Sequence, residues 1–571
     1  MSSNRSWLLV LVTIVVVILL AILAGVGFYW LTSRPPAVAR KTVIEVVESG
    51  SIEEVAAQNP LLQLFEQEKP SLWDLWRLFN YAARDDRVTG VYLEIQPLSL
   101  SWAQIEELRD CFHRFRQSGK PIHAFLAVDM VGERELYLAS AADSITLNPD
   151  AALIINGLAA EVTFYKSALK KLGVKPQFIQ FKEYKSPEIY DREKMSPPIR
   201  EMYQSILSDL EERFISAVTS DRTIEESRLK ELLAAGITTP NKALEAGLID
   251  TVGYKDEVQE RLRQPGSDKY HSMKASAYLE AAEGRFGSRS PHRVALVSGT
   301  GLITSGKNDP FSETLGGSTL STRLREIRKD GDFEAVLLRV NSPGGSAVGS
   351  DMVWKEVRKL EEAGKPVVVS MSGVAGSGGY YISMGARRII SQPSTITGSI
   401  GVIFGKFNIE GLYDWLGMSI DRVKTSPNAD LFSAFTSLQE DQKKLIRDWM
   451  QEIYDNFVSK AAEGRGMPAE ELEAKARGRI YTGDQASRIG LVDSLGGFEQ
   501  AVAEIKKILK LGPREEIQLV LYPKPKSLWA TLTEARFVQV PQPDFGVWLE
   551  RELHQLTTAT PRVLMPQARI D

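Results

Sequence analysis

Residues 363–383, AGKPVVVSMSGVAGSGGYYIS, contain the pattern that decides the fold. Val367–Met371 is a short, largely apolar run bounded by turn residues, which is typical of a strand buried on both faces. A glycine-rich segment follows, and the sequence from Tyr380 onward predicts a helix. The stretch therefore predicts a strand, a sharp turn and a helix, with Ser377 in the turn.

The residues before this stretch continue the alternation of strand and helix. Ala335–Val340 predicts another buried strand, and Met352–Glu362 predicts an amphipathic helix that ends before the Gly-Lys-Pro turn at 364–366. Strands and helices that alternate through short links indicate a parallel sheet. We therefore predict an α/β fold.

The first half of the chain repeats this pattern at a nearly constant distance. SGKPIHAFLA (118–127) corresponds to AGKPVVVSMS (363–372), 245 residues later. AGLIDTVG (246–253) corresponds to IGLVDSLG (489–496), 243 residues later. A nearly constant offset over residues 118–253 predicts a tandem duplication of one α/β unit.

The duplication and the flanking composition predict the boundaries of the units. The second linker is placed where the sequence is polar and rich in Gly, Ser and Ala. The predicted parts are a short cytoplasmic N-terminus (1–6), a transmembrane helix (7–31), a linker (32–40), a first repeat (41–267), a second linker (268–291), a second repeat (292–510) and a tail of unassigned fold (511–571).

The N-terminal span predicts a membrane anchor. Residues 7–31 carry no charge over 25 positions, and about 20 apolar residues are enough to cross a bilayer as a helix. A cleaved signal peptide is the alternative, but its apolar core is usually about 7–15 residues long. Arg5 precedes the span and Arg34, Arg40 and Lys41 follow it, which weakly favours a cytoplasmic location for the bulk of the chain.

Composition excludes several classes of function. The net charge of −4 and the pI near 6.0 give no electrostatic footprint for nucleic acid. The single cysteine, Cys111, excludes an intrachain disulfide framework and a cysteine metal cluster. We predict neither a cofactor nor a metal.

Ser377 has the surroundings that a nucleophile needs. At the start of a helix, backbone N–H groups point outward and carry partial positive charge, so the N–H of Gly378 can face an oxygen on the attacked carbon. NSPGG (341–345) also lies between a strand and a helix, and Gly345 offers a second N–H. The carboxyl ends of neighbouring parallel strands meet at one edge of a sheet. Gly345 and Gly378 therefore predict an oxyanion hole.

The first repeat lacks these groups. At an offset of 244 residues, Glu133 corresponds to Ser377. QPLSL (96–100) stands where the second repeat has NSPGG. Only the second repeat is therefore predicted to supply a nucleophile.

The base cannot be chosen from spacing. The candidates for a histidine base are few and poorly placed: His123 falls in a predicted buried strand, His113 in a charged helix and His554 in the unassigned tail. A Ser–Lys pair is the recognised alternative to a triad, but the chain has 69 Lys and Arg residues. The identity of the lysine stays open at this point.

The motif set resembles a known family. An N-terminal anchor, a duplicated α/β unit, NSPGGS (341–346), GSGGYYIS (376–383) and TGSIGV (397–402) are together similar to the signal peptide peptidase A family, or protease IV, in its long tandem form. The resemblance covers nearly the whole chain beyond the anchor. It implies a Clp protease/crotonase-like fold for each repeat.

The resemblance also implies the catalytic residues. The family's serine nucleophile falls on Ser377, its lysine, in a Y-K-S motif, on Lys185, and a serine that holds the lysine on Ser399. Gly376 replaces a common alanine and Pro187 follows the Y-K-S motif, but neither change removes a reacting group. A general base must be neutral, so we expect Lys185 to be buried with a lowered pKa.

The implied function is hydrolysis of hydrophobic peptides, notably signal peptides left in the membrane after secretion. The family implies a homotetramer at the bacterial inner membrane with its catalytic domains on the extracytoplasmic side, against the weak charge bias. Two alternatives stay open. One is a crotonase-like enzyme acting on acyl-CoA, and the other is a non-catalytic membrane scaffold, which would need none of Ser377, Lys185 and Ser399.

Overall fold

In the computed structural model, the described residues are 36–55, 69–263, 271–309, 312, 314–524 and the two short strands 562–564 and 569–570. No helix within these residues is long and apolar enough to cross a membrane. The predicted transmembrane helix at 7–31 lies outside the described residues.

The first repeat is built on a parallel six-stranded sheet. Its buried strands are rich in apolar residues on both faces, because helices cover both sides. In spatial order the strands are β10 (Ser272–Lys274), β1 (Thr42–Gly50), β2 (Val88–Leu98), β3 (Ile122–Leu126), β5 (Ser144–Leu147) and β9 (Thr251–Val252).

The second repeat contains a corresponding sheet with additional strands. The strands in order are β20 (Ile480–Thr482), β18 (Ile396–Gly398), β16 (Val367–Gly376), β14 (Ala335–Ser342), β11 (Arg293–Thr300) and β22 (Gln518–Leu521), with β17 (Arg388–Ser391) paired to β16 and β21 (Ser494–Leu495) paired to β17. All pairs are parallel except β18 with β20.

Three further sheets are present within the described residues. The order of the third sheet is β13 (Thr314–Gly316), β12 (Leu302–Thr304), β15 (Gly344–Ser346), β23 (Arg562–Leu564), β19 (Ile403–Asn408) and β8 (Lys175–Gln180). Two further pairs are β4 (Met130–Val131) with β6 (Ala152–Leu153), and β7 (Ala160–Glu161) with β24 (Arg569–Ile570). Because β8 belongs to the first repeat and β19 to the second, the third sheet joins the repeats.

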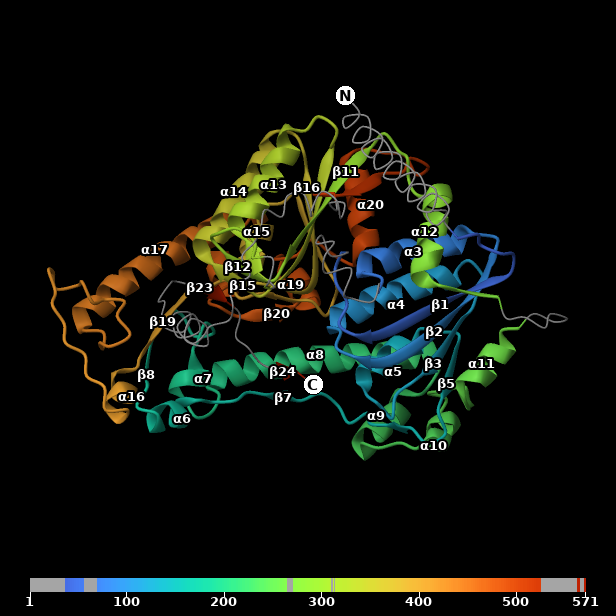
Figure 1. The fold of residues 1–571 in the computed structure, drawn as a ribbon, viewed down its shortest axis with the longest axis horizontal. Helices are drawn as coiled ribbons and strands as arrows, with labels where there is room; N and C mark the ends of the chain where they lie inside the picture. Colours follow the sequence, from blue (N-terminus) through green and yellow to red (C-terminus); the bar gives the residue numbers. More distant parts are fainter. Residues whose placement is uncertain are drawn as a thin grey trace, which may run out of the picture.

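Helices connect the strands in both repeats. In the first repeat they are α3 (Leu72–Arg84), α4 (Trp102–Arg116), α5 (Glu133–Ser140), α6 (Lys166–Lys171), α7 (Glu188–Asp191), α8 (Pro197–Arg222), α9 (Glu226–Ala235), α10 (Pro240–Glu245), α11 (Lys255–Arg261) and α12 (Ala275–Phe286). In the second they are α13 (Gly317–Lys329), α14 (Ala347–Glu362), α15 (Gly378–Ser383), α16 (Glu410–Trp415), α17 (Glu440–Arg465), α18 (Ala469–Lys475), α19 (Gly483–Arg488) and α20 (Phe498–Ile508). The long helices α8 and α17 each have 26 residues; in Figure 1, α17 lies at the upper left and α8 runs across the lower half of the view.

The two repeats pack closely around the second sheet. Helices α13 and α14 lie together on one side of that sheet, while α20 and the first repeat's α4 contact β16 (Figure 1). The first repeat therefore covers part of the sheet that ends at Ser377.

The segment predicted as a second linker, 268–291, contains regular structure. Strand β10 extends the first sheet beside β1, and α12 packs on α3. Tyr278 and Ala282 of α12 are buried. The small residues of this segment predict a linker, yet alanine is also the strongest helix former, and α12 is the result. Likewise β22, within the unassigned tail, extends the second sheet.

Candidate active site

Ser377 lies at the sharp turn between β16 and α15, as the sequence predicts. Its φ is 56°, a left-handed conformation that is rare for residues other than glycine. Its N–H donates to the Gly398 carbonyl at 2.7 Å, and its carbonyl accepts from Tyr381 N at 2.8 Å. The side chain is fully buried. The turn is thus held by backbone hydrogen bonds on both sides of the serine.

The two glycines predicted to form an oxyanion hole lie next to each other. Gly345 has φ +149°, and a Cβ there would lie 2.1 Å from the Ile303 carbonyl oxygen. A Cβ on Gly378 would lie 3.1 Å from the backbone nitrogen of Gly345. Glycine is therefore required sterically at position 345, a side chain at 378 would be crowded, and the structure brings the two backbones together beside Ser377.

Lys185 reaches Ser377 from the first repeat. Its Nζ lies 2.7 Å from Ser377 Oγ, 2.7 Å from Ser399 Oγ and 3.0 Å from the Ser399 carbonyl oxygen. The lysine is 192 residues from the serine in sequence and only 1% exposed. Gly478 makes this close packing possible, because a Cβ there would lie 2.5 Å from the Lys185 backbone nitrogen.

Ser399 is itself fixed in an unusual conformation. It has φ 53°, and its N–H donates to the Arg479 carbonyl at 2.7 Å. Both its hydroxyl and its carbonyl face the lysine nitrogen. The structure thus brings Lys185, Ser377 and Ser399 together.

The electrostatic setting lowers the pKa of Lys185. Complete burial holds this pKa well below the ordinary value of 10.5, because the charged ammonium is poorly solvated there. Its hydrogen-bond partners are two hydroxyls and a carbonyl, which carry no compensating negative charge. This environment favours the neutral amine form of Lys185 over the charged ammonium form.

The corresponding position of the first repeat has different chemistry. Glu133 Oε1 accepts hydrogen bonds from the N–H groups of Asn156 and Gly157 at 2.7 and 2.9 Å. His123 contacts Ser144 Oγ and His113 approaches Asp221, so both histidines have partners away from Ser377.

A strand from the tail lies at the candidate site. β23 pairs antiparallel with β15, with Val563 opposite Gly345, and Arg562 also pairs with Ile403 of β19. An extended segment therefore lies directly against the predicted oxyanion strand. The sequence of this segment carries little strand signal beyond a short run between Pro561 and Pro566.

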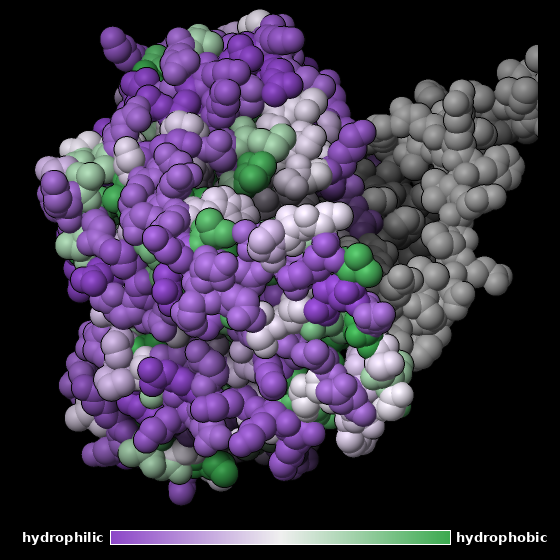
Figure 2. All heavy atoms as spheres, turned by 90° about the vertical axis from the view of Figure 1, so that its left-hand side faces the viewer, coloured by the Kyte–Doolittle hydropathy of each residue, from purple (hydrophilic) through white to green (hydrophobic). Residues whose placement is uncertain are grey.

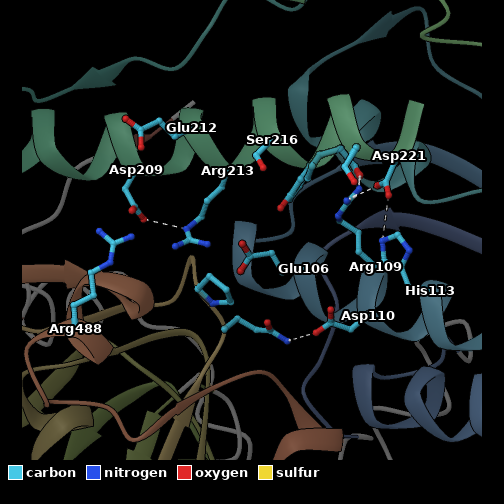
Figure 3. A pocket seen from close by; sticks show the side chains of 15 residues that line it. Glu106, Arg109, Asp110, His113, Asp209, Glu212, Arg213, Ser216, Asp221 and Arg488 are labelled. Carbon is cyan, nitrogen blue, oxygen red and sulfur yellow. Dashed lines mark hydrogen bonds and ion pairs between the residues drawn. The ribbon is translucent and has the colours of Figure 1, made fainter. Parts of the chain in front are cut away.

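A separate polar cavity of about 590 Å³ lies between α4 and α8 (Figure 3). Its charged side chains pair with one another, as in Arg109 with Asp221 at 2.6 Å and Arg213 with Asp209 at 3.1 Å. Burial raises the pKa of Glu106 there to about 7. The five predicted catalytic residues are not among the described residues that line it. Also within the described residues, no group of three or more His, Cys, Asp or Glu side chains can hold a metal.

Known proteins provide an independent comparison. The model of peptidase family S49 matches residues 114–268 and 359–512. "Serine protease SPPA, chloroplastic" from Arabidopsis thaliana is 32% identical over 468 residues, which cover 80% of this chain and 68% of that protein. "Protease 4" from Salmonella typhi is 32% identical over 461 residues, or 78% of this chain and 73% of that protein.

Two further similarities are partial. "Putative signal peptide peptidase SppA" from Enterococcus faecium is 37% identical over 224 residues, 39% of this chain and 65% of that protein. A solved mutant of ClpP1 from Listeria monocytogenes aligns with 37% of this chain and 94% of its own at a TM-score of 0.24 and 14% identity, too weak a likeness to support an argument.

Proposed function

This chain belongs to peptidase family S49 and is a serine peptidase, and we propose that Ser377 is its nucleophile and Lys185 its general base. The observation that carries this proposal is the distance of 2.7 Å between Lys185 Nζ and Ser377 Oγ. The lysine is buried, and the hydrogen-bond partners of its nitrogen carry no negative charge. A lysine pKa lowered by burial allows the amine to be neutral at the pH where it must accept a proton.

Ser399 is proposed to orient the lysine. A neutral amine has two N–H donors and one lone pair. Donation to the Ser399 hydroxyl and to the Ser399 carbonyl uses both N–H groups. The remaining lone pair then faces Ser377 Oγ, which is the direction that proton abstraction requires.

The reaction follows from these positions. Ser377 Oγ attacks the peptide carbonyl carbon while its proton moves to Lys185 Nζ. The N–H groups of Gly345 and Gly378 stabilise the negative oxygen of the tetrahedral intermediate. The ammonium then donates its proton to the leaving amine, and the C–N bond breaks. Lys185 Nζ then deprotonates a water molecule, which attacks the acyl-enzyme carbonyl. As the ester C–O bond breaks, Lys185 returns the proton to Ser377 Oγ.

Peptide substrates are proposed to bind as an extended strand. Strand β23 supports this mode, because β15 accepts it as an antiparallel neighbour opposite Gly345. A substrate would take the place of residues 562–564 between β15 and β19. Substrates are proposed to be hydrophobic peptides, including signal peptides, since the Enterococcus faecium relative is named "Putative signal peptide peptidase SppA".

The remaining expectations are also proposals. Residues 7–31 are proposed to anchor the chain in the bacterial inner membrane with the repeats on the extracytoplasmic side, and each repeat is proposed to share its fold with Clp proteases and crotonases. The parts at 41–267 and 292–510 are proposed as the two repeats.

A homotetramer is proposed as the assembly. On the side that carries α16 and one end of α17, hydrophobic side chains form small patches among hydrophilic ones (Figure 2). In this region Trp415 is 74% exposed and Val423 is 95% exposed. Contact with another copy of the chain would cover such side chains.

The test of the proposed function uses Ser377→Ala and Lys185→Ala. Each should abolish peptide hydrolysis, by at least about a thousandfold in kcat, while circular dichroism and thermal unfolding show a folded chain. Near-normal hydrolysis by either folded variant would contradict the dyad.

A further inference from the structure

A buried carboxylate of the first repeat lies behind the candidate active site. Glu54 is 2% exposed and follows the end of β1. Its Oε1 accepts hydrogen bonds from Gln104 Nε2 at 2.8 Å, Asn341 Nδ2 at 2.9 Å and Ser372 Oγ at 2.5 Å. Its Oε2 accepts from Arg339 Nε at 2.8 Å. Three of these four donors belong to β14 and β16 of the second repeat.

These two strands lose their regular pairing where Glu54 contacts them. Their residues pair one to one as far as Val340 and Met371, and pairing resumes at Ser342 and Ala375. Asn341 alone therefore faces three residues of β16. This irregularity is a bulge, which bends a strand and redirects the residues beyond it.

Glu54 contacts both sides of the bulge. It accepts from Asn341 on β14 and from Ser372 on β16. Asn341 also crosses the bulge, because its Oδ1 accepts from Val374 N at 3.1 Å. Polar side chains replace the missing ladder hydrogen bonds here, and the glutamate connects them.

The bulge lies just before both catalytic elements. Along β14 it is followed within four residues by Gly345, and along β16 it is followed within three residues by Ser377. The offset between the two strands at this point determines how the N–H groups of Gly345 and Gly378 lie relative to the Ser377 hydroxyl.

We propose that Glu54 is a positioning residue for the reaction: from the first repeat, it fixes the strand offset that aligns the oxyanion donors with the nucleophile. This inference rests on the proposed function, because it assumes that Ser377, Gly345 and Gly378 do the chemistry. The first repeat then contributes twice to catalysis, through Lys185 and through Glu54.

Glu107 provides a matched control. It is also a buried glutamate of the first repeat that binds Arg339, at 2.5 Å, and its Oε1 accepts from Phe498 N at 2.7 Å. Its hydrogen bonds go to Arg339 and Phe498, away from the bulge. Removal of either carboxylate disturbs the same buried arginine, but only removal of the Glu54 carboxylate takes away the acceptor for Asn341 and Ser372 at the bulge.

The experiment compares Glu54→Met with Glu107→Met in the full chain. Methionine keeps the length of each side chain and removes both acceptor oxygens, whereas glutamine would keep an oxygen that can still accept from Asn341 and Ser372. We measure kcat and KM on a peptide substrate, thermal unfolding, and the affinity of a peptide aldehyde whose hemiacetal oxygen occupies the oxyanion hole. Displacement of aligned groups by about 1 Å can lower a rate about a hundredfold. We expect Glu54→Met to lower kcat and aldehyde affinity by a common factor of about 10 to 100, with KM within twofold. Glu107→Met should leave kcat within twofold despite a similar loss of thermal stability.

Equal losses of kcat in the two variants, or an unchanged kcat in Glu54→Met, would overturn the inference. If Glu54→Met does not fold, Asn341→Leu removes the side-chain bridge while keeping its volume, and the same expectations apply. Ser377→Ala, measured in parallel, separates failure of the proposed function from failure of the positioning role. Retained hydrolysis by Ser377→Ala refutes the proposed function, whereas its loss together with a fully active Glu54→Met refutes only the positioning role.

Discussion

Replacement of Ser399 by alanine isolates the orientation of the base. The change removes one of the two acceptors for the Lys185 amine and leaves the Ser399 carbonyl at 3.0 Å and Ser377 Oγ at 2.7 Å. A buried donor without a partner costs about 1–3 kcal/mol. If the cost falls on the catalytically competent arrangement, kcat falls by a factor of about 5 to 150, since each 1.4 kcal/mol is about tenfold.

The assay is steady-state hydrolysis of a fluorogenic peptide over a range of pH. We expect the loss in kcat with KM little changed, because Ser399 contacts the lysine and lies in the protein interior. Ser321→Ala is the control, since it removes another buried hydroxyl, which donates to the Ser318 carbonyl within α13 and not to Lys185. A Ser399→Ala enzyme as active as the Ser321→Ala control would refute the orienting role.

Further perturbations test other parts of the account. Lys185→Met removes a group whose pKa is lowered on folding. Between the native pKa and 10.5 only the unfolded lysine binds a proton, so the free energy of unfolding of the wild type falls as pH falls. In urea unfolding, the difference in this free energy between wild type and variant should change by about 1.4 kcal/mol per pH unit. Parallel plots of unfolding free energy against pH for the two proteins would contradict a neutral lysine. Gly345→Ala should lower kcat about a hundredfold or more, because its Cβ would overlap a carbonyl and displace one oxyanion donor; normal kinetics would exclude that donor. Arg339→Met should reduce stability by about 3–5 kcal/mol in the same unfolding assay, because it leaves two buried carboxylates unpaired, and an unchanged midpoint would contradict this. Deletion of 562–571 should lower KM for peptides, because β23 then no longer competes for β15; an unchanged KM would indicate that peptides bind elsewhere.

The proposed nucleophile and its proposed oxyanion donors could be predicted from local sequence. Ser377 follows a buried apolar strand and precedes a helix, and the glycines beside it are required by short-range sterics that leave a clear pattern. Comparison of the two repeats also shows that Glu133 occupies the position of Ser377 in the first repeat. Local sequence patterns therefore predict the part of the candidate site that the second repeat supplies.

The proposed base, Lys185, and the proposed positioning residue, Glu54, could not be predicted in the same way. Lys185 is brought to Ser377 across 192 residues by the packing of two repeats, and no spacing rule selects one lysine among many. Glu54 likewise acts through tertiary contacts with a bulge, whose presence depends on strand register. Only the family resemblance pointed to Lys185, and nothing in the sequence pointed to Glu54.

The most direct test of the central claim is the rate at which a fluorophosphonate modifies Ser377 as a function of pH. If Lys185 is the general base, the wild-type rate should rise with pH to a plateau, with an apparent pKa well below 10.5. In Lys185→Ala the reaction should be slower by about a thousandfold or more, and that inflection should be absent. Equal rates and equal pH profiles in the two proteins would show that Ser377 does not depend on Lys185.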